Sequence, residues 1–149
     1  MNTLTTLPAF QAYAAATLVL GFNLLGIANA TAVTRTQAKE CINPEDTKLG
    51  KDNKVVFDEG NDRTQRYRRA HRNALENSPL FIITAFVLTL MGTSATLGWA
   101  LFGSFAAFRV LHTVCYVKGI QPFRTMFFGL AQLVQFVVLG LIVYGAFSG

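Results

Sequence analysis

The stretch "RTQRYRRAHRNALENSPLF" (residues 63–81) carries the densest charge of the chain directly into an apolar run. It holds five arginines, and after Glu76 the next charged residue is Arg109. About 20 apolar residues suffice for a helix to cross the hydrocarbon core of a bilayer. The stretch therefore predicts a helix that begins in water, carries its arginines to the boundary and continues into a membrane.

The composition of the whole chain agrees with a membrane protein. Of its 149 residues, 52% are hydrophobic and 14% are charged. Residues 1–34, 77–108 and 125–149 contain no charge, a pattern that is rare in soluble proteins. The net charge of +5 belongs to one polar segment and does not form the spread basic surface of a nucleic-acid-binding protein. The length fits a single domain, residues 1–149.

Four apolar segments are long enough to span a membrane, at about residues 8–34, 74–92, 96–117 and 123–147. The expected fold is therefore all-α, an integral-membrane four-helix bundle. Short turns at "MGTSAT" and "KGIQ" make consecutive spans antiparallel neighbours. Asn61 or Asp62 is the expected N-cap of a helical extension over 62–73, and Pro122 the expected first residue of the last helix.

Charge asymmetry predicts the orientation of the bundle. By the positive-inside rule the loop over about 35–61 is cytoplasmic, and both termini lie on the opposite side. Lys118 and Arg124 flank the other connection on the loop side, which agrees. The expected location is a bacterial inner membrane or the endoplasmic reticulum. The segment "IANA" near residue 30 could mark a cleavage site, but no basic region precedes the apolar run, which favours a retained span.

Polar residues share one face on each of two expected helices. On the second, Arg69, Arg72, Asn73 and Glu76 are spaced i, i+3, i+4 and i+7, and Arg66 and Pro79 extend this stripe. On the third, Arg109, His112 and Tyr116 repeat the spacing i, i+3 and i+7. Ionised side chains are costly against lipid, so such residues usually face the bundle interior, pair with each other or bind a ligand.

A plainer interpretation is that Glu76 neutralises Arg72 or Arg109 while the other arginines reach the headgroups. His112 could then be a neutral histidine bonded across helices, and Tyr116 an interfacial aromatic. One glutamate cannot balance the whole set of arginines, so the surplus positive charge favours an anionic ligand.

Several other kinds of site are not indicated by the sequence. His71 and His112 have no zinc-ligand spacing, so no metal is expected. No glycine-rich phosphate loop is present. Cys41 and Cys115 are expected to be free thiols, because two cysteines so differently placed do not suggest a disulfide framework.

Four motifs carry a resemblance to a known family: "NPED" (43–46), "RAHRNALEN" (69–77), "RVLHTVCY" (109–116) and "RTMFFGLAQL" (124–133). Together and in this order they resemble the membrane-associated proteins in eicosanoid and glutathione metabolism, the MAPEG family. The resemblance implies a homotrimer of four-helix subunits. It also implies a glutathione molecule held between neighbouring subunits near the cytoplasmic side.

The resemblance also implies roles for particular residues. The expected glutathione-binding residues are Arg69, Arg72, Asn73, Glu76, His112, Tyr116 and Thr125, with Arg35 reaching in from the adjacent subunit. Arg124 matches the arginine beside the glutathione sulfur and is the expected catalytic residue. Three departures favour a transferase over a prostaglandin synthase: Phe128 replaces a tyrosine of that synthase, the interval from Tyr116 to Arg124 is one residue shorter, and Asn23 replaces a lysine of some members.

The leading hypothesis is a membrane-bound glutathione transferase that activates glutathione as a thiolate for lipophilic electrophiles, with reduction of lipid hydroperoxides as a further reaction. Its expected partners are these substrates, membrane lipid and two further copies of the chain, and no nucleic acid. Alternatives are a non-catalytic member that binds lipid or a partner, a prostaglandin E synthase-like isomerase, and a small anion pore. The complete stripe with Arg124 favours the enzyme. A polar stripe that ends at Tyr116 argues against the pore.

Overall fold

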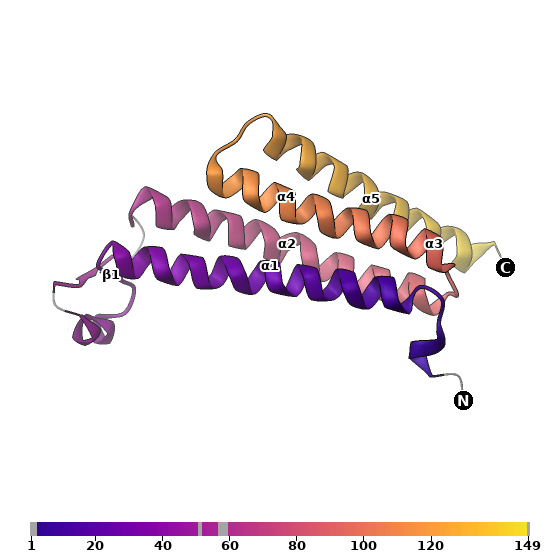
Figure 1. The fold of residues 1–149 in the computed structure, drawn as a ribbon, viewed down its shortest axis with the longest axis horizontal. Coiled ribbons are helices and arrows are strands. Elements are labelled where there is room, and N and C mark those ends of the chain that lie inside the picture. Colours follow the sequence, from indigo (N-terminus) through magenta and orange to yellow (C-terminus); the bar gives the residue numbers. More distant parts are fainter. Residues whose placement is uncertain (1–2, 51, 57–59, 149) are drawn as a thin grey trace.

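The computed structural model describes residues 3–50, 52–56 and 60–148, most of them helical (Figure 1). The long helices are α1 (Phe10–Gln37), α2 (Asp62–Leu90), α4 (Ser104–Lys118) and α5 (Phe123–Phe147). A short helix α3 (Ala95–Gly98) and a π-helical turn η3 (Trp99–Gly103) lead into α4 without a break. Together α3, η3 and α4 make the third long helix of the bundle.

Shorter elements lie before α1 and between α1 and α2. They are the 3-10 helices η1 (Leu4–Thr6) and η2 (Pro44–Leu49) and the two-residue strands β1 (Glu40–Cys41) and β2 (Lys54–Val55). The strands pair in parallel, with Glu40 opposite Lys54 and Cys41 opposite Val55. The sequence pattern predicted turns in this loop but not the strand pair. Residues 51 and 57–59 of the loop lie outside the described residues.

Local side chains determine where the helices begin and end. The Asn61 side chain caps α2 by accepting a hydrogen bond from the Arg63 amide at 2.8 Å, as expected for an N-cap. Gly119 ends α4 in the left-handed region (φ 71°), and a Cβ there would collide with the Arg66 guanidinium. Pro122 is the residue before α5 and not its first helical residue, a shift of one position from the expectation.

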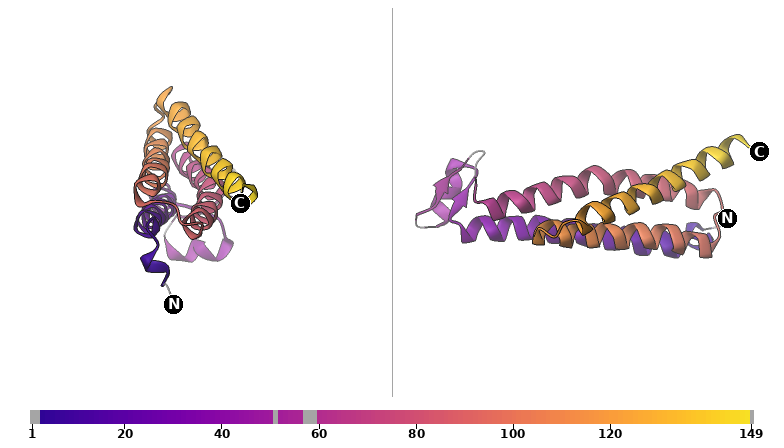
Figure 2. Two further views of the ribbon diagram at one scale, coloured as in Figure 1. Left: turned by 90° about the vertical axis from the view of Figure 1, so that its right-hand side faces the viewer. Right: turned by 90° about the horizontal axis from the view of Figure 1, so that it is seen from above.

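The long helices form an antiparallel bundle (Figures 1 and 2). Both chain termini lie at one end, while the α1–α2 loop and the α4–α5 turn lie at the other. α1 and α2 extend beyond the α4–α5 turn, and α2 remains one unbroken helix through this extension. Within the described residues, four helices have the length and hydropathy needed to cross a membrane: α1, α2, the continuous helix from α3 through η3 to α4 (Ala95–Lys118), and α5.

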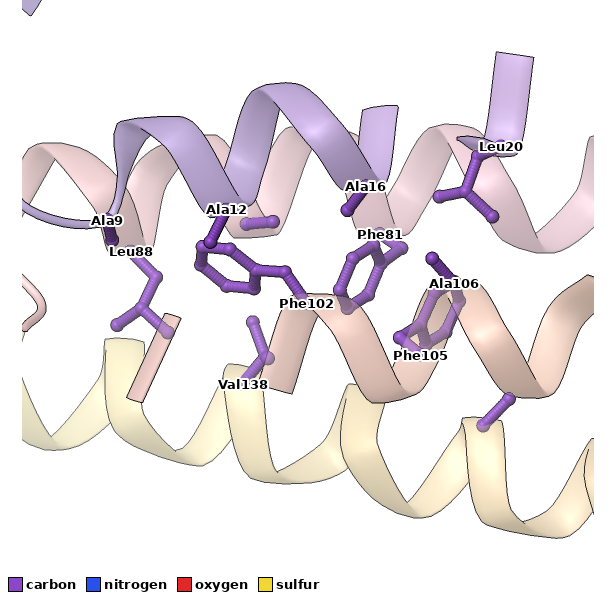
Figure 3. Close-up of a cluster of buried hydrophobic side chains, with 12 residues drawn as sticks. Ala9, Ala12, Ala16, Leu20, Phe81, Leu88, Phe102, Phe105, Ala106 and Val138 are labelled. Atoms are coloured by element: carbon purple, nitrogen blue, oxygen red, sulfur yellow. The ribbon is translucent and has the colours of Figure 1, made fainter. Parts of the chain in front are cut away.

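An aromatic core fills the part of the bundle near the termini, which we call the terminal half (Figure 3). Phe81 of α2 stacks on Phe105 of α4 with ring centroids 3.6 Å apart, and Phe102 meets Phe81 edge-on at 6.1 Å. Ala12 and Ala16 of α1 face these rings, and their small side chains let α1 approach closely. Dense apolar packing therefore holds this half together.

The other part of the bundle, which we call the loop half, has a smaller apolar cluster made by Ile27, Ala70 and Ala74. On the outside of the bundle, apolar side chains such as Phe22 and Phe136 are each 70% exposed. A bilayer provides apolar surroundings for such side chains, which water would not. The loop half has fewer buried apolar groups than the terminal half, and it contains the predicted site.

Candidate functional site

One cavity of about 280 Å³ brings together the polar stripe of α2 and a side chain of α4. It is lined by Arg69, Arg72, Asn73, Glu76 and Tyr116. The first four lie on one face of α2 because they are spaced by one and two helical turns. Tyr116, in the last turns of α4, closes the cavity from the neighbouring helix.

The cavity has a surplus of positive charge. Arg72 Nε lies 3.3 Å from Glu76 Oε1, and their side chains are 82% and 59% exposed. Such an exposed pair contributes little to stability. Arg69 has no ion pair among the described residues. The arrangement thus presents two guanidinium groups and a single carboxylate to whatever enters.

A second cavity of about 520 Å³ continues from the first toward α1. It shares Arg69 and Arg72 with the smaller cavity and adds Arg68 and His71. The two shared arginines therefore lie between the cavities, and their flexible side chains can serve a ligand longer than either space alone.

Arg109 lies beneath the stripe and is almost completely buried, with 1% of its surface exposed. Its Nη2 donates to the Asn73 backbone oxygen at 3.1 Å and to Asn73 Oδ1 at 2.7 Å. A guanidinium has only donors, so Oδ1 must face Arg109 and the Asn73 Nδ2 group remains a donor for the cavity. Of the two pairs that the plainer interpretation offered for Glu76, the structure has the one with Arg72 and not the one with Arg109.

Asn73 is held further by a chain of amide side chains. Asn77 Nδ2 donates to the Asn73 backbone oxygen at 2.7 Å, and Asn77 Oδ1 accepts from Gln132 Nε2 of α5 at 2.8 Å. The hydrogen bonds thus connect α4, α2 and α5 through one residue of the stripe. Such a connected network fixes the position of Asn73 more firmly than a single bond would.

Arg124 lies at the start of α5, next to the Tyr116 side of the cavity. Its guanidinium carbon is 4.8 Å from the centroid of the Tyr116 ring, a cation–π distance. The His112 Nδ1 atom lies 2.9 Å from the Arg124 backbone oxygen, so this nitrogen carries the proton and donates. His112 therefore anchors the first turn of α5 and, with it, Arg124.

A glutamine in the turn orients the Arg124 side chain. With the Gln121 amide oxygen toward Arg124, it accepts from Nη2 at 2.6 Å and from Nε at 3.1 Å, and the amide nitrogen donates to Thr125 Oγ1 at 3.2 Å. This orientation satisfies all three groups. Arg124 and Thr125 thus share Gln121 as a hydrogen-bond partner.

Most of the predicted residues lie close together. Five line the smaller cavity, Arg124 and His112 contact Tyr116 at its edge, and Thr125 bonds the Gln121 amide that holds Arg124. Arg35 is different: it lines a separate cavity of about 370 Å³ in the α1–α2 loop, together with Lys39 and Cys41. Within one chain, Arg35 does not join the stripe.

Two positioning residues, Gln121 and Asn77, were not predicted from the sequence. Asn77 is spaced i+4 from Asn73, which could have indicated a contact along the same face of α2. Gln121 lies in a turn, where no periodicity indicates what a side chain faces. Within the described part of the chain, no group of three or more histidine, cysteine or acidic side chains could hold a metal ion.

Comparison with known protein families identifies the family of this chain. The model of the MAPEG family matches residues 13–144. The chain belongs to the MAPEG family. With four helices of spanning length in a membrane-associated family, it is an integral membrane protein.

Curated relatives in the MAPEG family fall into two named groups. Prostaglandin E synthase of Homo sapiens is 30% identical over 127 residues, which cover 85% of this chain and 82% of the relative. Microsomal glutathione S-transferase 1 of Homo sapiens is 32% identical over 122 residues, 80% of this chain and 79% of the relative. The same transferase of Rattus norvegicus is 34% identical over 125 residues, 82% and 79% of the two chains.

Proposed function

We propose that this protein is a membrane-bound glutathione transferase that conjugates glutathione to lipophilic electrophiles. The observation that carries the proposal is the cavity lined by Arg69, Arg72, Asn73, Glu76 and Tyr116, at the polar end of membrane-spanning helices. Relatives named microsomal glutathione S-transferase 1 support the same activity.

The groups in the cavity match the charges of glutathione, which has two carboxylates and one ammonium. Arg69 and Arg72 offer planar guanidinium groups that suit carboxylates. The free Nδ2 of Asn73 adds a neutral donor. Glu76 is the only acidic residue between 63 and 149, and it suits the ammonium.

Arg124 is proposed to stabilise the glutathione thiolate. A cysteine thiol has a pKa of about 8.5, so little of it is ionised at neutral pH. A fixed guanidinium and the positive end of the α5 dipole both favour the anion. The thiolate then attacks the electrophilic carbon, a carbon–sulfur bond forms, and the leaving group departs with its electron pair. The thiol proton passes to solvent.

One side chain favours a transferase over a prostaglandin synthase. Phe128 packs its ring against His112, with ring centroids 5.7 Å apart. Since a phenylalanine has no hydroxyl, that position offers no polar contact to a substrate. Reduction of lipid hydroperoxides needs only the same thiolate and a second glutathione, which yields glutathione disulfide, water and the alcohol.

The proposed assembly is a homotrimer with the α1–α2 loop on the cytoplasmic side. Arg35 lies away from the cavity of its own chain, so its proposed contact with glutathione requires a neighbouring copy. Light scattering of the detergent-solubilised protein, corrected for detergent, is expected to give the mass of three chains. A mass of one chain would exclude this arrangement.

The activity can be tested on protein purified in detergent. Addition of glutathione and 1-chloro-2,4-dinitrobenzene is expected to release chloride and form the glutathione conjugate, with saturation in glutathione. Calorimetric titration with glutathione alone should show binding. If neither binding nor conjugation is detected in folded protein, the proposal is wrong; binding without conjugation would favour the non-catalytic alternative.

A further inference from the structure

A fourth cavity of about 330 Å³ lies between α1 and α4, and it shares no residue with the three cavities described above. Its walls are mostly apolar, with Phe22 and Ala30 on α1 and Val114 and Val117 on α4. We call it the α1–α4 groove. The bond from Asn23 Nδ2 to Thr113 Oγ1, 3.1 Å long, joins the two helices within it.

The groove runs along the membrane-spanning part of the bundle. From Phe22 to Ala30 it follows α1 for about 12 Å, at 1.5 Å per residue. Phe22 lies near the middle of α1, whereas Lys118 at the opposite end is the last residue of α4. The groove therefore extends from the hydrocarbon interior to the membrane boundary on the loop side.

A missing side chain keeps the groove open. A Cβ built on Gly26 would have no atom within 4 Å, and Gly26 lines the groove. Phe22 at the inner end is 70% exposed, so the wall faces outward toward lipid. A flexible hydrocarbon chain can enter such a space sideways from the bilayer.

The mouth of the groove is positively charged. Lys118 lines it, and the Arg66 guanidinium packs against Gly119, the next residue. Neither cation has an ion pair among the described residues, and the groove has no acidic lining residue. Unneutralised cations at a membrane boundary attract anionic headgroups.

We propose that the α1–α4 groove binds an anionic phospholipid of the loop-side leaflet. One acyl chain lies along Phe22, Gly26 and Val114, and the headgroup phosphate meets Lys118 and Arg66. The apolar length, the open wall at Gly26 and the charged mouth each match one part of such a lipid. This site is independent of the proposed glutathione chemistry.

The test is lipid retention, measured by native mass spectrometry on delipidated protein in detergent to which phosphatidylglycerol or phosphatidylcholine has been added. Wild-type protein is expected to retain one phosphatidylglycerol per chain in preference to phosphatidylcholine. Gly26→Leu fills the groove and should lower this retention about tenfold, because the acyl chain then loses its contacts along α1. Val114→Phe narrows the groove from α4 and should act in the same direction.

Matched variants separate the groove from general effects. Gly21→Leu is the control, because Gly21 also has no atom within 4 Å of a built Cβ but does not line the groove. Lys118→Gln with Arg66→Gln should remove the preference for phosphatidylglycerol, about fivefold per cation. Lys48→Gln, an exposed loop lysine, should leave it unchanged.

Three outcomes would overturn the proposal. The first is wild-type retention in folded Gly26→Leu and Val114→Phe proteins, with helicity checked by circular dichroism. The second is equal retention of the two lipids by wild-type protein. The third is that Gly26→Leu changes the oligomer mass and not the bound lipid, which would make the groove a contact between copies.

Discussion

The loop half of the bundle buries ionisable side chains, whereas the polar groups buried in the terminal half, such as Thr84 and Thr89, are uncharged. In the terminal half, stacked rings of Phe81 and Phe105 fill the space between helices. In the loop half, the buried groups include Arg109, whose Nε and Nη1 have no partner among the described residues, and His112, whose Nε2 has none. The cavities described above all lie in the loop half or the loop itself.

The difference indicates that the terminal half mainly stabilises the bundle, whereas the loop half carries the proposed site. The dense apolar packing of the terminal half holds the four helices together. The loop half contributes less, because its cavities leave contacts between helices unmade. Buried polar groups cost free energy unless they are paired, and they are retained most often at sites of function. We therefore expect mutations in the two halves to separate stability from glutathione binding.

The largest expected effect is on stability, from Phe81→Ala in the terminal half. Loss of a buried phenylalanine that stacks on one ring and meets a second edge-on should cost about 3 to 5 kcal/mol and clearly lower the Tm in detergent. Glutathione affinity of the protein that remains folded should stay within about twofold, because Phe81 lines neither arginine cavity. Leu133→Ala, at a side chain that is 60% exposed, is the control and should change the Tm little.

The next effect is on binding, from Asn73→Asp in the loop half. The new carboxylate keeps, and charges, the contact to Arg109, so the Tm should not fall. It replaces the free Nδ2 donor with an anion, so glutathione affinity should drop about 100-fold, measured by titration calorimetry. If Asn73→Asp lowered both the Tm and the glutathione affinity, Asn73 would be a structural residue, and mutations in the two halves would not separate stability from binding. Asn77→Asp, outside the cavity, is the matched variant. It should lower the Tm and change the glutathione affinity little.

Arg124→Ala should lower turnover about 10- to 100-fold, which corresponds to about 1.4 to 2.7 kcal/mol in the barrier. Glutathione affinity should change only a fewfold, because the carboxylate contacts remain. Thiolate absorbance at about 240 nm should appear when wild-type protein meets glutathione and be absent in the variant. Arg124→Lys keeps the charge and should recover part of both signals. A variant with full absorbance and turnover would show that another group activates the thiol.

The smallest effect is expected from Glu76→Gln, which removes the exposed ion pair with Arg72. Stability should change by less than about 0.5 kcal/mol. Glutathione affinity should fall about tenfold, since the ammonium loses its carboxylate. A glutathione analogue without the α-amino group provides the control, because wild-type and variant proteins should bind it equally. A Tm that falls sharply in Glu76→Gln would instead make the pair a structural element of the loop half.

Much of the fold could be predicted from the sequence because lipid imposes strict limits on charge. The apolar segments predicted four long helices, and the structure has them. The capping asparagine at 61 followed from its position before the arginines. Pro122 was misplaced by one residue, and the π-helical turn at Trp99–Gly103 was not foreseen, since neither boundary has a periodic signal.

The candidate site was predictable along each helix but not between helices. Spacing placed Arg72, Asn73 and Glu76 on one face, where the cavity is found. It could not tell which residue Arg109 would contact, because helical periodicity says nothing about the rotation of one helix against another. The Arg109–Asn73 hydrogen bond depends on that rotation, and the contact of the Gln121 amide with Arg124 depends on the turn between α4 and α5. Only the three-dimensional structure shows these two contacts.

The unbroken α2 helix links the site to the thickness of the bilayer. Its 29 residues span about 43 Å, whereas the hydrocarbon core is about 30 Å thick. Since α2 continues as one helix from the arginine stripe into the bilayer, a thicker membrane would bring Arg69 and Arg72 closer to hydrocarbon, and the mismatch would be relieved by local thinning of the bilayer or by extension of the arginine side chains to the headgroups. The access of glutathione to the cavity should then depend on lipid chain length, so reconstitution in short- and long-chain bilayers becomes a way to tune the proposed activity without changing a residue.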